Sequence, residues 1–369
     1  MLNYKTTMLA AGAVGLMATG SLTPVTAADY SGKTFTMIVG ASPAGGQSRS
    51  ARAWARHLGK YMSGNPKFIV KNLPGAAGNK SKNYIYNKAK KDGFTLHWGP
   101  MNQMGALLKL RGVNFDPAKF QLIGAGDVSY YTLIMANTGS GLNSAADLPK
   151  TKGIIFGGRA PHSNLDIYGR VPLELFGIKY RYVVGYKGSS KISPALQAGE
   201  INMASAGNPG YNAFYKNGIV KNGKAIGLYY HTAMNEKGEA ARFPGYFGKA
   251  KHFIDYYKDM TGKEPSGDLW EAYKWVSKYA IWPFSFAAPP GAPAEVVADL
   301  RKAYLAVRDD KAFRADWEKT VSPIHRFLGG KEATWLLTDY KNASPAALAG
   351  LKRLTGQKAR KLKKKKKKK

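Results

Sequence analysis

The chain has 369 residues, a net charge of +33 at pH 7 and no cysteine. The lack of cysteine excludes disulfide bonds, a thiol nucleophile and a thiolate metal site. Its length suits two domains of ordinary size, and residues 29–351 alone carry a net charge of +20, so the body of the protein is expected to be strongly basic.

The N-terminus has the pattern of an export signal. Lys5 supplies a positive charge, Met8–Met17 is a short apolar run, and the small residues Val25-Thr26-Ala27 form a cleavage site, with Ala28 as a near-equal alternative. No other run reaches the length of a membrane-spanning helix. We therefore predict a signal peptide at residues 1–28 and a mature protein located in the periplasm.

The first predicted strand, Phe35–Val39, leads into a glycine-rich turn and then into a helix predicted at 48–61, in which apolar residues recur at helical spacing. A strand, a glycine turn and a helix N-terminus capped by Ser48 together form a ready site for an anion. The candidate ligand-binding residues here are Ser42, Ala44, Gly45, Gly46, Gln47 and Ser48. The alternative interpretation is an ordinary turn between a strand and a helix.

Two more glycine turns follow. Asn72–Gly78 comes after the strand-like residues 68–70, and Gly157–Ser163 comes after the strand-like residues 153–156. In the latter turn, Ser163 is the expected cap of a helix, with Asp166 completing a capping box. An arginine guanidinium matches a carboxylate with two hydrogen bonds, so Arg159 is a candidate anion ligand; the alternative is a solvated loop charge. The candidates in this turn are Gly158, Arg159, Ala160, His162 and Ser163.

Strand-like and helix-like segments alternate along the whole chain, which is typical of an α/β fold with mainly parallel sheets. Ligands in such folds bind at the carboxyl ends of the strands, where the glycine turns lie. The polar stretch 235–268 suggests a lid-like insertion. Residues 363–369 are seven consecutive lysines, for which we predict a disordered tail at 358–369. Such a tail could contact an anionic polymer or membrane, or it could be a solvated end.

The common catalytic signatures are missing from the sequence. It contains no G-x-S-x-G elbow, no P-loop and no H-E-x-x-H pair, and its six histidines lack metal-ligand spacing. No catalytic residue, metal or cofactor is therefore predicted. Nucleic acid is not an expected partner, because the sequence has no RNP-like string and no recognition-helix pattern.

Five strings in this order resemble the extracytoplasmic solute receptors of tripartite tricarboxylate transporters, the Bug family. They are SPAGGQSRSAR (42–52), GNPKFIVKNLPGAAG (64–78), KDGFTL (91–96), VVGYKGSSKISPALQAGEIN (183–202) and AAPPGAPAEVVADLRKAY (287–304). The segment 262–275 is similar to the longer branch of that family.

The resemblance implies a type II periplasmic binding protein: two α/β lobes with a hinge and a ligand cleft between them. Lobe one would comprise 29–130 and 283–357 and lobe two 131–282, with the chain crossing near Asp127–Leu133 and Ala280–Phe286. Family ligands are small carboxylates, held between the turn after the first strand and the glycine turn of lobe two. Tyr186 and Ser205 are also candidate ligand-binding residues.

The chain departs from the family pattern in both turns. Ala44 and Ser48 stand where the family usually has a glycine and an aspartate, and Ala160 and His162 stand at family glycine positions. These changes agree with a more cationic pocket; the alternative is a receptor whose ligand specificity has diverged from that of the family. We predict a monomeric periplasmic receptor that captures a small organic anion, which the resemblance implies is a carboxylate, and delivers it to the permease subunits of such a transporter. The alternatives are a solute-sensing receptor of the same fold and, third, a secreted enzyme.

Overall fold

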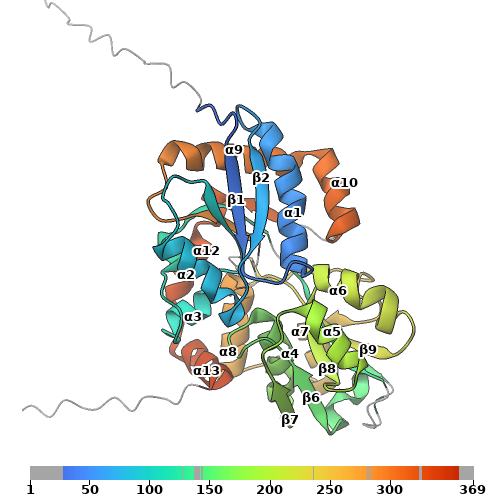
Figure 1. Cartoon of the computed structure of the whole chain (residues 1–369). Coiled ribbons are helices and arrows are strands. Elements are labelled where there is room, and N and C mark those ends of the chain that lie inside the picture. Colours follow the sequence, from blue (N-terminus) through green and yellow to red (C-terminus); the bar gives the residue numbers. More distant parts are fainter. Residues whose placement is uncertain are drawn as a thin grey trace, which may run out of the picture.

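The computed structural model describes residues 28–356, except 127, 137–141, 143, 236, 281, 283 and 324–325. The predicted polylysine tail, and the predicted signal peptide apart from its last residue, lie outside these residues. The described part forms two α/β lobes, each built around its own six-stranded sheet (Figure 1). The α/β fold class predicted from the sequence is confirmed.

The two sheets define the lobes. Lobe one contains, in spatial order, β12 (Phe327–Gly329), β4 (Gln121–Gly126), β11 (Ser285–Ala288), β3 (Thr95–Gly99), β1 (Thr34–Val39) and β2 (Lys67–Asn72). Lobe two contains β10 (Lys251–His252), β9 (Ala225–His231), β5 (Tyr130–Met135), β8 (Met203–Gly207), β6 (Ile154–Gly157) and β7 (Tyr180–Val183).

The expectation of mainly parallel sheets holds only in part, because both sheets are mixed, with five parallel and five antiparallel pairings among the described strands. β11 runs antiparallel to β3 and β4, and β5 runs antiparallel to β8 and β9. β5 and β11 are the first strands after the chain passes from one sheet to the other. They enter their sheets from the cleft between the lobes, whereas β1, β3 and β8 end at that cleft, so the directions are opposed.

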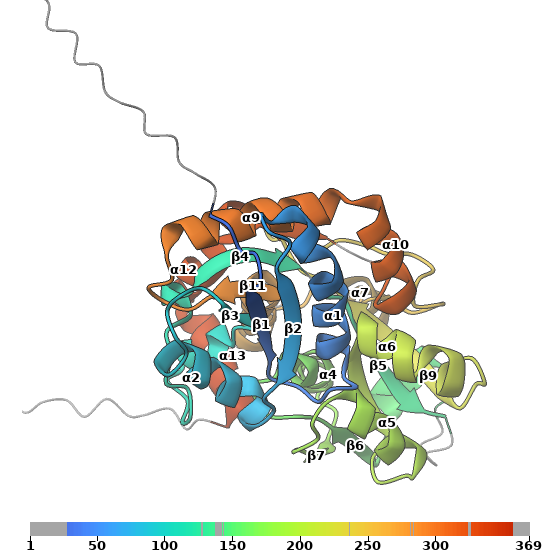
Figure 2. The same cartoon turned by 45° about the horizontal axis from the view of Figure 1, so that its top comes forward.

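Helices cover both sheets (Figure 2). Those that follow lobe-one strands are α1 (Gly46–Leu58), α2 (Asn79–Asn87), α3 (Gln103–Leu107), α9 (Ala294–Asp309), α10 (Lys311–Thr320), α11 (Gly330–Ala333) and α12 (Trp335–Thr338). Those that follow lobe-two strands are α4 (Asn164–Leu175), α5 (Ser189–Gln197), α6 (Asn208–Phe214), α7 (Phe253–Thr261) and α8 (Asp268–Trp275). None of the described helices is long and apolar enough to span a membrane.

The core of lobe one is centred on α1. Ala51, Trp54 and Leu58, which recur at the predicted helical spacing, are fully buried. The indole ring of Trp54 stacks on the ring of Tyr304 from α9, with centroids 4.2 Å apart and planes within 1°. Burial of aromatic side chains of this size supplies much of the stability of a core. The apolar face predicted from the sequence therefore anchors α1 between the sheet and the C-terminal helices.

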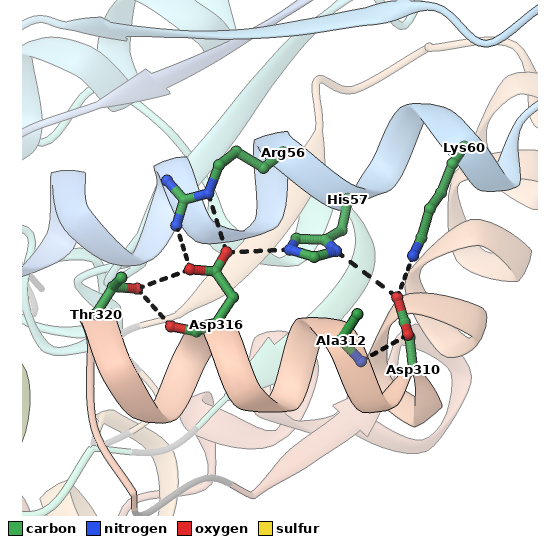
Figure 3. A network of polar contacts seen from close by, with 7 residues as sticks. All are labelled: Arg56, His57, Lys60, Asp310, Ala312, Asp316 and Thr320. Carbon is green, nitrogen blue, oxygen red and sulfur yellow. Dashed lines mark hydrogen bonds and ion pairs between the residues drawn. The ribbon is translucent and has the colours of Figure 1, made fainter.

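A polar network fixes the C-terminal half of α1 to α10 (Figure 3). Arg56 donates two hydrogen bonds to the carboxylate of Asp316, at 2.8 and 2.9 Å. The His57 ring lies between two carboxylates, with Nε2 3.0 Å from Asp316 and Nδ1 3.6 Å from Asp310, and Lys60 pairs with Asp310. Since the other end of α1 faces the cleft, this network holds that end in place relative to lobe one.

The C-terminal helix α13 (Pro345–Thr355) packs against α8, and Figure 1 shows the two side by side. Arg353 forms an ion pair with Glu174 of α4 at 2.9 Å, and Arg170 donates to the carbonyl of Leu354. The segment after β12 thus returns to helices of lobe two. The predicted lobe limits stay a prediction, and here the lobes are defined by their sheets.

Candidate anion-binding site

A cavity lies at the cleft, where strands of both sheets end. Its lining includes Gly46 from lobe one, Tyr130 and Arg159 from lobe two, and Phe284 from the segment that returns to lobe one. The space in which the centre of a water molecule can lie is about 100 Å³. One water needs only about 10–15 Å³ by this measure. The cavity is therefore large enough for several waters or a small organic molecule.

Three helices begin at this cavity: α1 from lobe one, and α4 and α5 from lobe two. The residues that precede their first turns, Gly45, Ser163 and Gly188, all line it, and in none of them does a side chain cap the helix. The first N–H groups of a helix have no acceptor within the helix, and the helix dipole adds positive potential at that end. The cavity is thus supplied with backbone donors suited to an anion.

Arg159, in the turn between β6 and α4, supplies a positive charge from lobe two. Its Nε is buried and has no hydrogen-bond partner among the described residues. Burial lowers the pKa of the guanidinium, although the nearby Asp166 acts in the opposite direction. Because an arginine stays charged in a protein, its unmet donor and charge are a cost that an anionic ligand could offset.

Lys82, on α2, supplies a positive charge from lobe one. Its side chain is 1% exposed, and Nζ donates to the carbonyl oxygen of Gly78 at 2.9 Å. Among the described residues, no carboxylate forms an ion pair with it. Burial, with a further contribution from the charge of Arg159, lowers the pKa of Lys82 to about 7.

The remaining titratable groups of the site are His162 and Asp166. Burial, with the charges of Lys82 and Arg159, lowers the pKa of His162 to about 4, so its ring is neutral at pH 7. Asp166 is fully buried, and its carboxylate accepts from the Tyr182 hydroxyl at 2.5 Å and from a backbone N–H at 3.1 Å. Burial raises the pKa of Asp166. The cationic groups are therefore only partly balanced by acid.

The second glycine turn positions Lys82. Gly78 has φ +90°, a left-handed conformation that favours glycine, and it packs closely on Gly40 after β1. A Cβ on Gly40 would lie 2.7 Å from the Cα of Gly78. This close approach places the Gly78 carbonyl where it accepts a hydrogen bond from Lys82. The turn therefore fixes the position of the Lys82 amino group at the cavity.

Six of the sequence-predicted site residues line the cavity. They are Gly45, Gly46, Gln47, Arg159, His162 and Ser163. The other seven, Ser42, Ala44, Ser48, Gly158, Ala160, Tyr186 and Ser205, do not. Ligand binding by any of the thirteen residues stays a prediction.

Ser48 does not cap α1 as expected. The helix begins two residues earlier, at Gly46, and Ser48 lies fully buried in its first turn. Its hydroxyl donates to the Ser42 carbonyl at 2.8 Å and accepts from the Asn72 amide at 2.6 Å. Ser48 therefore ties the first two glycine turns together, and the uncapped helix end remains open to the cavity.

The other predicted residues outside the cavity also have structural partners. Ser42 contacts Ser190 of lobe two, with hydroxyl oxygens 3.2 Å apart. The Ser205 hydroxyl lies 2.8 Å from that of Thr132 inside the lobe-two sheet, and the Tyr186 hydroxyl donates to Glu200 at 3.2 Å on the surface.

Gly158 and Ala160 surround the carboxylate of Asp166. Ala160 donates its N–H to it, and a Cβ on Gly158 would collide with it. Ala44 is exposed.

Sequence reasoning missed several lining residues, among them Lys82, Asn102, Tyr130, Lys187 and Ser189. The first turn of α2 carries no acid and two lysines, Lys80 and Lys82, which both oppose the helix dipole. No local signal therefore distinguishes the buried Lys82 from the exposed Lys80. Tyr130 and Phe284 follow chain crossings between sheets, which hydrophobic periodicity does not locate.

Among the described residues, no group of histidine, aspartate or glutamate could hold a metal ion.

The fold and the cleft can be compared with known structures. The chain is similar to the periplasmic binding protein BugD, with 15% identity, a TM-score of 0.65, and coverage of 89% of this chain and 99% of BugD. The chain has the fold of a periplasmic binding protein. The two-lobed periplasmic binding protein fold predicted from the sequence is thereby confirmed.

Two further neighbours with this fold are structures with a bound carboxylate. R. palustris Rpa4515 with adipate is 19% identical, with a TM-score of 0.66 and coverage of 89% of this chain and 99% of that one. MatC (Rpa3494) from Rhodopseudomonas palustris with bound malate is 14% identical, with a TM-score of 0.61 and coverage of 88% and 98%. No family model and no curated protein sequence matches the chain. The predicted resemblance to Bug-type binding proteins is confirmed at the level of the fold.

Proposed function

We propose that this protein is a periplasmic receptor that captures a small organic anion, a carboxylate, in the cavity between its lobes. The observation that carries the proposal is the convergence of three uncapped helix N-termini with Lys82 and Arg159 on one cavity. A neutral ligand would leave these charges unpaired, at a cost of several kcal/mol. A carboxylate supplies both acceptors and negative charge.

The likeness to binding proteins holding adipate and malate supports the same chemistry. Both are small dicarboxylates, and a cavity of this size and charge suits such a molecule. We propose that binding draws the two lobes together, since a ligand that touches both is held best when they approach. No reaction is part of the proposal.

We further propose that the receptor is a monomer and delivers its ligand to the permease subunits of a tripartite tricarboxylate-type transporter. The fold of BugD and the export signal in the sequence support this part of the proposal.

The test is to denature freshly purified protein and identify the released small molecules by mass spectrometry. The proposal expects an organic acid in an amount close to that of the protein. It also expects a smaller amount of the molecule in an Arg159→Ala variant prepared in parallel. A neutral sugar or a cationic amine, released from the wild-type protein but not from the variant, would contradict the proposal.

A further inference from the structure

Two cations from opposite lobes face one cavity. Lys82 stands on α2 of lobe one, and Arg159 stands in the β6–α4 turn of lobe two. Arg159 has a buried carboxylate nearby, that of Asp166, which favours its charged form. Lys82 has no such partner among the described residues. The two cations are therefore not equivalent, and Lys82 is the one that lacks a counter-charge.

The titratable groups that face Lys82 either disfavour its charge or are neutral. They are the Arg159 guanidinium and the His162 ring from lobe two and the His97 ring from β3. The face of the Phe115 ring, whose centroid is 5.8 Å from Nζ, is a weak attraction that does not supply a counter-charge. An ammonium has three N–H donors, and the Gly78 carbonyl satisfies one. An ammonium at this position thus has donors available for a ligand in the cavity.

This inference rests on the proposed function. We propose that Lys82 and Arg159 close from the two lobes on the same anionic group of the ligand, and that Lys82 takes up one proton from solvent as that group arrives. The bound carboxylate supplies the negative charge that the empty cavity lacks, so it favours the ammonium over the neutral amine. The lysine thereby couples capture of the anion to capture of a proton.

The coupling gives the site a defined pH dependence. Lys82 loses its proton near pH 7 in the empty protein and keeps it to higher pH in the complex. Affinity is then greatest below pH 7 and falls as pH rises above it, by up to about tenfold per pH unit. Since burial lowers the pKa values of His162 and His97 to about 4 and about 3, those rings do not account for a change near pH 8.

The experiment is calorimetric titration with malate, with adipate and with any acid found in the purified protein. It is run at pH 8 in triethanolamine and in Tris, two buffers that differ in their enthalpy of ionisation and carry no anionic group that could compete for the site. The dependence of the apparent binding enthalpy on the buffer gives the number of protons taken up. The wild-type protein is expected to take up about one proton per ligand bound, as linkage requires for a group that is mostly neutral before binding.

Three variants separate the role of Lys82 from general effects. Lys82→Arg keeps a permanent charge and is expected to bind without proton uptake. Lys82→Met is expected to lose at least about tenfold in affinity, the equivalent of one charged hydrogen bond, together with the uptake. His162→Gln is expected to retain the uptake. Circular dichroism establishes that each variant is folded.

The outcomes distinguish this inference from the proposed function. Saturable binding of a carboxylate by the wild-type protein without proton uptake would overturn the inference and leave the proposed function standing. Undiminished proton uptake by the Lys82→Met variant would likewise overturn the inference and leave the proposed function standing. If no small carboxylate binds at any pH, the proposed function fails, and the inference fails with it.

Discussion

Replacing Lys82 by methionine is expected to stabilise the ligand-free protein while weakening ligand binding. The pKa of Lys82 falls from 10.5 to about 7 in the folded protein because its charged form is buried. One pKa unit corresponds to about 1.4 kcal/mol, so the charged lysine costs ~5 kcal/mol of stability well below pH 7 and ~4 kcal/mol at pH 7. Methionine fills similar space without a charge.

The sign of the pH dependence follows from proton counting. Between pH 7 and 10.5 the unfolded chain holds a proton on Lys82 that the folded chain lacks, so the stability of the wild-type protein rises with pH in this window. At pH 9.5, one unit below the pKa of a lysine in the unfolded chain, burying Lys82 costs only ~1.4 kcal/mol of stability. Losing the hydrogen bond to Gly78 costs the variant ~1 kcal/mol at any pH. The net gain is therefore ~3 kcal/mol at pH 7 and close to zero at pH 9.5.

The assay is urea unfolding of ligand-free wild-type and Lys82→Met protein at pH 7.0 and 9.5, followed by circular dichroism. Lys80→Met is the matched control, because Lys80 is exposed on the same helix and its replacement should change stability by less than ~0.5 kcal/mol. A Lys82→Met variant that is less stable than the wild type at both pH values would refute the reasoning. So would a stability difference that does not change with pH.

Four further results are expected. Arg159→Ala should weaken carboxylate binding by about 1.5–3 kcal/mol in calorimetry, and unchanged affinity would remove this residue from the site. Gly46→Ala places a Cβ 2.9 Å from that of Pro209 across the cleft. It should therefore reduce the ligand-dependent compaction seen by small-angle scattering, whereas full compaction would show that the lobes need not approach there. Asp316→Ala breaks the α1–α10 network and should cost ~1–2 kcal/mol in urea unfolding, and unchanged stability would show that the network does not anchor α1. A chain ending at Gly356 should bind ligand as the full chain does, and weaker binding would contradict a dispensable tail.

Local patterns predicted much of the fold. The strands that precede the glycine turns and the amphipathic face of α1 were located within a few residues, because both depend on periodicity and on nearby turn residues. The direction of β5 and β11 could not be predicted in this way, because it depends on where the chain crosses between sheets. The short β12, which pairs with β4, also lacks a periodic signal.

The site was predicted in part for the same reason. Helix starts mark Gly46 and Ser163, and an arginine in a glycine turn marks Arg159, so these could be read locally. The role of Lys82 could not be predicted in this way, because it depends on burial of the side chain and on the approach of Arg159 from a turn 77 positions further along the chain. Gly158 comes from the same turn but does not line the cavity, and its N–H donates to the Val183 carbonyl, so its role as a ligand-binding residue stays a prediction.

The most direct test of the central claim is a calorimetric titration of ligand-free protein at pH 6.5 with malate, with adipate and with glucose as a neutral control. At this pH Lys82 and Arg159 both carry charge. The account predicts saturable binding of at least one of the two carboxylates, with one site per chain, and no heat of binding with glucose. Binding of glucose, or no binding of either carboxylate, would contradict it.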